Sequence, residues 1–136
     1  MTSADRFINV LVYSDDSTTR AAVLAALGTR VAPELPRLNF VECATEPVVI
    51  RQMDSGTIDL VILDGEATPA GGMGICRQLK DEIFNCPPVI VLTARPQDGW
   101  LATWSRAEAA VPQPIDPVVL AEAVATLIRR RLAVTA

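Results

Sequence analysis

The sequence has 136 residues, half of them hydrophobic, and a formal net charge of −4 at pH 7. This length is typical of one ordinary domain with a single core, and the acidic balance argues against a nucleic-acid-binding surface, which needs a basic field. No apolar run is long enough to span a bilayer, and no secretory signal is visible. We therefore expect a single domain over residues 1–136, in the cytoplasm and without membrane insertion.

Histidine is missing from the sequence, and cysteine and lysine are scarce. Without histidine the chain can form no histidine-based triad, metal site or phosphocarrier. Three cysteines, Cys43, Cys76 and Cys86, lie far apart in apolar stretches without a CxxC motif, which indicates buried free thiols. Lys80 is the only lysine, and the arginine run at residues 129–131 is expected to complement the dipole at the end of a helix rather than bind phosphate.

Strand and helix patterns alternate along the chain. Short apolar or alternating runs predict strands over residues 7–13, 38–43, 60–63, 89–92 and 109–111. Helical patterns follow these runs and begin near Ser17, Glu46, Gly74, Asp98 and Asp116. The buried side of the last helix is expected to carry Val119, Leu120, Val124, Leu127 and Ile128. Five strand–helix repeats predict an α/β fold with a five-stranded, parallel, doubly wound sheet.

Polar residues follow four of the predicted strands, at the point where each strand ends. Asp15 and Asp16 follow the first strand, Asp64 ends the third, Thr93 follows the fourth and Gln113 follows the fifth. In a doubly wound sheet these points lie on one edge and can converge. Carboxylates that meet there suit a hard cation such as Mg²⁺. A carboxylate held against Mg²⁺ could also act as a nucleophile toward a phosphoryl group and form an acyl phosphate.

This arrangement resembles the receiver domain of bacterial two-component response regulators, over essentially the whole chain. The resemblance implies the (βα)₅ flavodoxin-like fold and a cytoplasmic signalling role in a phosphorelay, without enzyme activity. Since the sequence pattern indicates no second domain, we expect a stand-alone receiver domain without an output domain. The matching residues are Asp15 for the second acid of the family's acidic pair, Asp64 for the phospho-acceptor, Thr93 and Ala94 for the switch hydroxyl and its small neighbour, and Pro114 for the proline of the Lys-Pro pair.

The chain departs from the family pattern at four positions. Ser14 stands at the first acid of the pair, Gln113 stands at the lysine, and Ala110 stands at the switch aromatic of the fifth strand. Pro69 comes five residues after Asp64 instead of four. The acceptor is therefore kept, while its electrostatic partner and the aromatic relay are missing.

Two basic residues could be considered as substitutes for the missing lysine. Lys80 cannot serve, because it belongs to the third helix, away from the site. Arg95, two residues after Thr93, is either a replacement cation or a solvated loop residue. A neutral amide at Gln113 should stabilise an acyl phosphate less than an ammonium would, because charge-assisted hydrogen bonds are about twice as strong as neutral ones.

The candidate metal ligands are Asp15, Asp16, Asp64 and Glu66. Either of the first two could instead cap the first helix, and Glu66 could add a ligand or be exposed. Mg²⁺ binding is therefore expected to be weakened or absent.

A pair of tryptophans, Trp100 and Trp104, is spaced i,i+4 on the short fourth helix. They are either core residues or an exposed aromatic patch for a partner, and the alanine-rich surroundings favour the patch. The resemblance implies a sensor kinase or another signalling protein as partner. It also implies a possible homodimer through the fourth helix, fifth strand and fifth helix.

Two functions fit the resemblance. The favoured one is a pseudo-receiver, a constitutive protein-binding module that has kept the scaffold and lost the switch. The alternative is a Mg²⁺-dependent switch, phosphorylated at Asp64, with weakened coupling. A remoter third possibility is a flavodoxin-like nucleotide- or flavin-binding protein or a phosphohydrolase, against which the lack of a phosphate-binding loop speaks.

Overall fold

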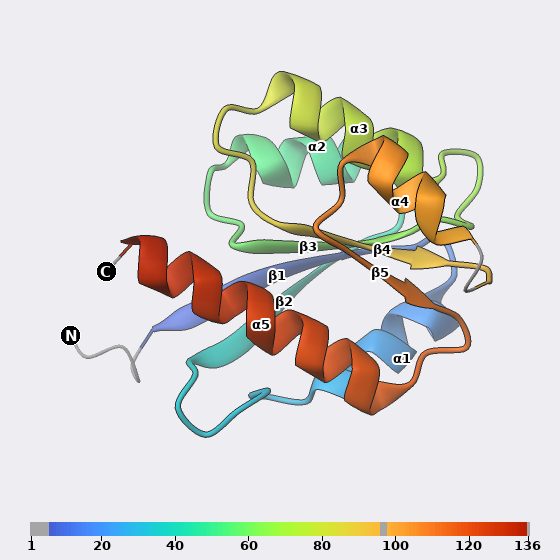
Figure 1. Ribbon diagram of the computed structural model, residues 1–136. Helices are drawn as coiled ribbons and strands as arrows, with labels where there is room; N and C mark the ends of the chain where they lie inside the picture. The colour runs from blue at the N-terminus through green and yellow to red at the C-terminus, as the bar shows by residue number, and fades with distance from the viewer. Residues whose placement is uncertain (1–5, 96–97, 136) are drawn as a thin grey trace.

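The computed structural model describes residues 6–95 and 98–135, which form one parallel sheet between two layers of helices (Figure 1). The strands are β1 (Phe7–Tyr13), β2 (Arg37–Cys43), β3 (Leu60–Asp64), β4 (Val89–Thr93) and β5 (Ala109–Pro112). The helices are α1 (Ser17–Leu27), α2 (Glu46–Asp54), α3 (Gly72–Glu82), α4 (Gly99–Ser105) and α5 (Pro117–Thr135). The predicted strands and helices are all present, with ends shifted by at most two residues.

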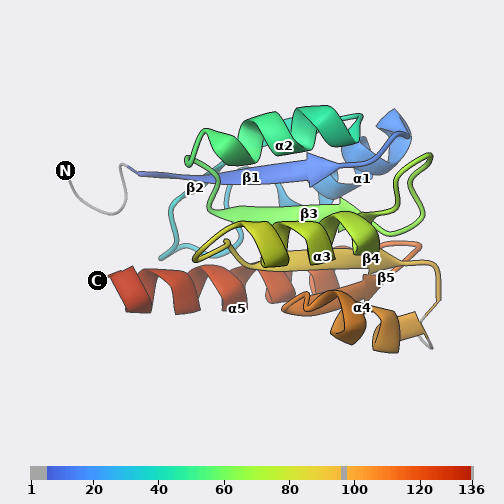
Figure 2. The same ribbon diagram turned by 90° about the horizontal axis from the view of Figure 1, so that it is seen from above.

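The strand order in the sheet is β2-β1-β3-β4-β5, and every neighbouring pair is parallel. Helices α2, α3 and α4 cover one face, and α1 and α5 cover the other (Figures 1 and 2). Strand β2 is added on one side of β1, and β3, β4 and β5 follow on the other side, so the topological switch point lies between β1 and β3. Polar groups at the carboxyl ends of these strands are therefore well placed for a site.

The two faces of the sheet bury separate sets of apolar side chains, as the alternation of side chains along a strand requires. The face under α1 and α5 carries Val10, Val12, Leu60, Ile62, Ile90 and Leu92. The face under α2 and α3 carries Leu11, Tyr13, Val61, Leu63, Val89 and Val91. Because β1, β3 and β4 are buried on both sides, their sequences are nearly continuous apolar runs.

The start of α5 differs from the sequence expectation. Asp116 caps this helix as predicted, because its Oδ1 accepts a hydrogen bond from the Val118 amide at 2.9 Å. Leu120 is fully buried, but Val119 is 44% exposed. The prediction for Val119 was wrong because this first turn presents the residue to solvent, which a helical period alone does not reveal.

The arginine run also has another role than predicted. Helix α5 continues to Thr135, so residues 129–131 do not lie in its last turn. Arg129 pairs with Glu34, and Arg131 lies 3.5 Å from a carboxylate oxygen of Asp59. These arginines therefore attach α5 to the loops that precede β2 and β3.

Free thiols occur at all three cysteines, with Cys43 and Cys76 buried and Cys86 half-buried. None of the described helices is both long and apolar enough to cross a membrane.

Candidate functional site

The predicted convergence of polar residues is present at the carboxyl edge of the sheet. Asp64 ends β3 and is 4% exposed. It is one of the residues that line an open pocket of about 630 Å³. The described residues that line this pocket are Asp15, Asp16, Thr19, Asp64, Glu66, Ala94, Gln113 and Pro114. The pocket thus contains four carboxylates and, among these lining residues, no basic side chain.

Three donors satisfy the Asp64 carboxylate, and all of them are uncharged. The Ser14 hydroxyl donates to Oδ2 at 2.8 Å, and the Gln113 side-chain amide donates to Oδ1 at 3.0 Å. The backbone amide of Glu66 also donates to Oδ1, at 2.9 Å. Gln113, which stands at the position of the family's lysine, therefore contacts Asp64 directly, but it brings no charge.

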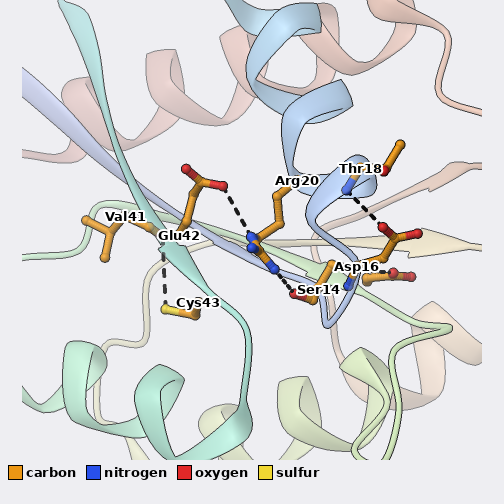
Figure 3. Close-up of polar contacts among 8 residues, drawn as sticks. Ser14, Asp16, Thr18, Arg20, Val41, Glu42 and Cys43 are labelled. Atoms are coloured by element: carbon orange, nitrogen blue, oxygen red, sulfur yellow. Dashed lines mark hydrogen bonds and ion pairs between the residues drawn. The ribbon is translucent and has the colours of Figure 1, made fainter.

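The turn after β1 is held tightly by hydrogen bonds (Figure 3). Asp16 caps α1, because its Oδ1 accepts from the Thr18 amide at 2.8 Å, while its own amide donates to the Ser14 hydroxyl at 3.0 Å. Arg20 donates to the Ser14 carbonyl at 2.7 Å and pairs with Glu42 at 3.2 Å. Of the two acids after β1, Asp16 is thus the one that serves the helix.

The Asp15 carboxylate has a partner outside the acidic set. The Thr68 hydroxyl donates to its Oδ2 at 3.1 Å. Within residues 6–95 and 98–135, no three histidine, cysteine or carboxylate side chains lie close enough together to hold a metal ion. The four predicted ligands therefore share one pocket, but they do not form a preassembled cluster of three.

The ends of β4 and β5 are joined behind the pocket. Thr93 is 1% exposed, and its carbonyl accepts a hydrogen bond from the Gln113 backbone amide at 2.8 Å. Ala94 lines the pocket directly. Backbone contact between these strand ends fixes the place from which the Gln113 side chain reaches Asp64.

Neither of the two basic residues considered from the sequence takes the lysine's place. Arg95 is turned toward Asp98, with 3.0 Å between its Nη2 and Oδ1, and its side chain is 65% exposed. Hydrogen bonding to the Asp98 carboxylate raises the pKa of Arg95. Lys80 pairs with Glu108, ahead of β5, at the opposite edge of the sheet from Asp64. The exclusion of Lys80 is confirmed, and Arg95 is not the replacement cation.

Two contacts that the sequence did not signal attach the β3–α3 loop to β1. Besides the Thr68–Asp15 bond, the Tyr13 hydroxyl donates to the Ala70 carbonyl at 2.5 Å. Burial, assisted by the negative charges of Asp15, Glu46 and Asp64, raises the pKa of Tyr13 above its ordinary value of 10.0. The close approach of the start of α3 to the end of β3 also requires Gly72, because a Cβ there would lie 2.7 Å from the Asp64 carbonyl oxygen.

The two tryptophans of α4 are exposed, as the favoured interpretation predicted. Trp100 is 65% exposed and Trp104 is 49% exposed. The guanidinium of Arg77, from α3, lies 4.6 Å from the centre of the Trp104 ring and also donates to the Trp104 carbonyl at 3.0 Å. We call Trp100, Trp104 and Arg77 the aromatic patch.

No family model matches the sequence, but comparison with known proteins finds close relatives and structures of the same fold. An uncharacterized response regulatory protein of Mycobacterium tuberculosis is 61% identical over 129 residues, which are 95% of this chain and 97% of that protein. The chain belongs to the response regulators. An uncharacterized response regulatory protein from a second M. tuberculosis strain has the same identity and coverage relative to this response regulator.

Solved structures show the same fold at low sequence identity. The receiver domain of the Francisella response regulator 1452 superposes with a TM-score of 0.76 and 17% identity, over 90% of this chain and 98% of that one. The chemotaxis response regulator CheY4 of Vibrio cholerae gives a TM-score of 0.75 at 15% identity, over 90% and 99% of the two chains. These likenesses show that this response regulator has the receiver fold. Its membership of the response regulators, shown by the mycobacterial relatives, makes it a signal-transduction protein.

Proposed function

We propose that this response regulator is a pseudo-receiver: a module that signals through protein contacts in the cytoplasm, not through catalysis, and whose acceptor site is fixed in one state. One observation carries the proposal. Both oxygens of Asp64 are occupied by the neutral donors Ser14 and Gln113, at 2.8 and 3.0 Å. In the family pattern those positions hold an acid and a lysine, which would respectively assist a cation and bind the phosphoryl group.

The charge of the pocket supports the same conclusion. A phosphoryl group adds about 1.5 to 2 negative charges at neutral pH. It would enter a pocket whose described lining contains four carboxylates and no basic residue. Gln113 can donate hydrogen bonds to it but cannot neutralise it, so an acyl phosphate on Asp64 would gain little from its surroundings.

Receiver domains generally take up Mg²⁺ for phosphorylation, and the donor set here fits such an ion only in part. Carboxylate oxygens are the ligands that Mg²⁺ prefers, and one or two carboxylates plus water can suffice. Asp15 and Asp64 would be the ligands, and the ion would supply positive charge beside the acceptor. Binding would compete with the Thr68 hydroxyl for Asp15 and with the Ser14 hydroxyl for Asp64, which predicts weak affinity.

An amide NMR titration with Mg²⁺, followed by Mg²⁺ with beryllofluoride, tests the proposal. Beryllofluoride mimics a phosphoryl group on a carboxylate. We expect no shifts, or shifts from the metal that stop at the sheet edge. Shifts at Asp15, Asp64 and Thr93 that spread to the indole signals of Trp100 and Trp104, and vanish in Asp64→Asn, would contradict it.

The alternative function is a Mg²⁺-dependent switch with weakened coupling. It is favoured by the presence of Asp64 and Thr93 at the ends of adjacent strands, beside a pocket that is open to solvent. The same titration separates the two functions, because only the switch transmits a change from Asp64 to α4.

The aromatic patch is the surface that we propose for partner binding. Tryptophan and arginine are enriched among residues that dominate binding energy, and Trp104 is already held by Arg77. A receiver domain with the same fold, that of Ssk1 (TM-score 0.75, 16% identity, 90% of this chain and 89% of that one), has been crystallised with the histidine phosphotransfer protein Ypd1. A sensor kinase, another signalling protein or a second copy of this chain are the proposed partners. If a second copy binds here, Trp104→Ala should lower the sedimentation coefficient at high concentration.

A further inference from the structure

We propose that Asp64 acts as a structural hub that joins the ends of β1, β3 and β5, and that Ser14 and Gln113 are energetically coupled through its carboxylate. This inference rests on the pseudo-receiver proposal and deepens it. It states what keeps the site in one state when neither a metal ion nor a phosphoryl group does so.

The geometry places the two donors on different oxygens of one side chain. Ser14 follows β1, the neighbour of β3, and its hydroxyl reaches Oδ2. Gln113 follows β5, which is separated from β3 by β4, and its amide reaches Oδ1 across the end of β4. The carboxylate therefore bridges chain segments that are 99 residues apart in sequence (113 − 14 = 99).

Each donor is itself held in place by other contacts. The Ser14 hydroxyl donates to Asp64 while it accepts from the Asp16 amide, and the residue is fully buried. The Ser14 amide donates to the Cys43 carbonyl at 3.2 Å. The Gln113 backbone amide is tied to Thr93. Neither donor can leave Asp64 by moving its backbone without breaking a second hydrogen bond.

The burial of Asp64 makes this network energetically important. A buried charge is costly unless hydrogen bonds replace the lost hydration, and here three donors lie within 3.0 Å of the carboxylate. In the described part of the chain, no buried side-chain nitrogen or oxygen lacks a hydrogen-bond partner. Removal of the carboxylate would leave the buried Ser14 hydroxyl and the Gln113 amide without their acceptor.

The hydrogen bonds to Asp64 and the negative charge of the pocket predict opposite effects of Asp64 on stability. In a pocket governed by repulsion among its acids, replacement of Asp64 by a neutral residue would stabilise the fold. In a pocket organised around Asp64 as a hub, the same replacement destabilises it. The two accounts therefore make opposite predictions for one substitution.

The test is a set of urea unfolding measurements on the full chain. Ser14→Ala and Gln113→Met are each made in the wild type and in Asp64→Ala. The matched control is Gln78→Met, at a half-exposed position of α3, far from Asp64, whose side chain donates a hydrogen bond to Glu82. In the wild type we expect each site substitution to raise the unfolding equilibrium constant about tenfold. In the Asp64→Ala background the same changes should raise it about twofold at most, and Asp64→Ala itself should destabilise.

Equal costs in both backgrounds, or a stabilised Asp64→Ala variant, would overturn the proposal. If Asp64→Ala does not fold, the side-chain amide signal of Gln113 serves as a second measurement. Ser14→Ala should shift this signal, although the residues make no direct contact, and an unchanged signal would equally overturn the inference. A beryllofluoride response would disprove the pseudo-receiver function, whereas additive unfolding costs would disprove only the hub.

Discussion

Lys80 and Glu108 form an ion pair at the amino-terminal edge of the sheet, opposite the edge that carries Asp64. The pair is largely buried, with side-chain exposures of 14% for Lys80 and 28% for Glu108. Lys80 also donates to the Pro87 carbonyl, and Glu108 accepts from the Val89 amide. The chain's lysine thus organises the start of β4 and β5, at the edge of the sheet opposite to Asp64.

Substitution Lys80→Met should destabilise the fold without affecting the site. Loss of the ammonium leaves Glu108 partly buried with a backbone amide as its remaining donor, which should cost about 1–3 kcal/mol in the free energy of unfolding. Urea unfolding measures this cost. The double variant Lys80→Met/Glu108→Gln should recover part of the loss, because no uncompensated charge then remains. A shift of the Asp64 amide signal in Lys80→Met would contradict the separation of the two edges.

Substitution Gln113→Lys should bring the site closer to a working switch. An ammonium would replace a neutral donor 3.0 Å from Asp64 Oδ1 and could bind a phosphoryl group with a charge-assisted hydrogen bond. We expect Mg²⁺ with beryllofluoride to shift the Asp64 and Thr93 amides in this variant more than in the wild type. Gln113→Met, which has a similar size and no charge, is the control and should show no such gain.

Alkaline pH should destabilise the fold through buried thiols. Burial raises the pKa of Cys43 and of Cys76 to about 11, from an ordinary value of 9.0. Between these values the folded state keeps a proton that the unfolded state loses, so the stabilising contribution is complete below pH 9 and declines as the pH rises toward 11. The slope is at most about 1.4 kcal/mol per pH unit for each thiol.

Urea unfolding at a series of pH values from 8 to about 11 measures this slope. The double variant Cys43→Ala/Cys76→Ala should be less stable at neutral pH, because it leaves small cavities, but its stability should fall less steeply above pH 9. An identical slope in the variant would show that the thiols do not cause the decline. Tyr13, whose pKa is also raised, adds loss in the same direction above pH 10.

Neighbouring positions on α5 should respond very differently to truncation. Leu120 is fully buried, whereas Val119 is 44% exposed. We expect Leu120→Ala to cost about 2–5 kcal/mol and Val119→Ala to stay within about 0.5 kcal/mol. Thermal or urea unfolding distinguishes them. Similar losses for both variants would mean that Val119 is covered in solution.

The sequence predicted the scaffold well because the scaffold depends on periodicity. Strands buried on both faces must be apolar runs, and parallel strands must end on one edge, so Asp64, Thr93 and Gln113 could be brought together without coordinates. The direction of the Arg95 side chain could not be predicted in the same way. Asp98, three residues later, offers it a carboxylate at 3.0 Å, and spacing alone could not choose between Asp98 and the pocket.

Contacts that decide the chemistry of the site depend on side-chain direction. The sequence shows only that Ser14 stands where the family has an acid. That its hydroxyl donates directly to Asp64 depends on the conformation of the turn after β1. The bond from Thr68 to Asp15 joins segments 53 residues apart and depends on the path of the β3–α3 loop. No local pattern encodes either orientation, since tertiary packing selects among several rotamers.

The burial of Lys80 has a practical consequence for chemical labelling. The sequence contains one lysine, and its amine is engaged by Glu108 and the Pro87 carbonyl. Amine-directed reagents, crosslinkers and acetylating agents should therefore modify this side chain slowly. A lysine introduced at position 113 would face the open pocket instead. Its rate of modification would therefore measure how accessible the sheet edge that carries Asp64 is to solvent.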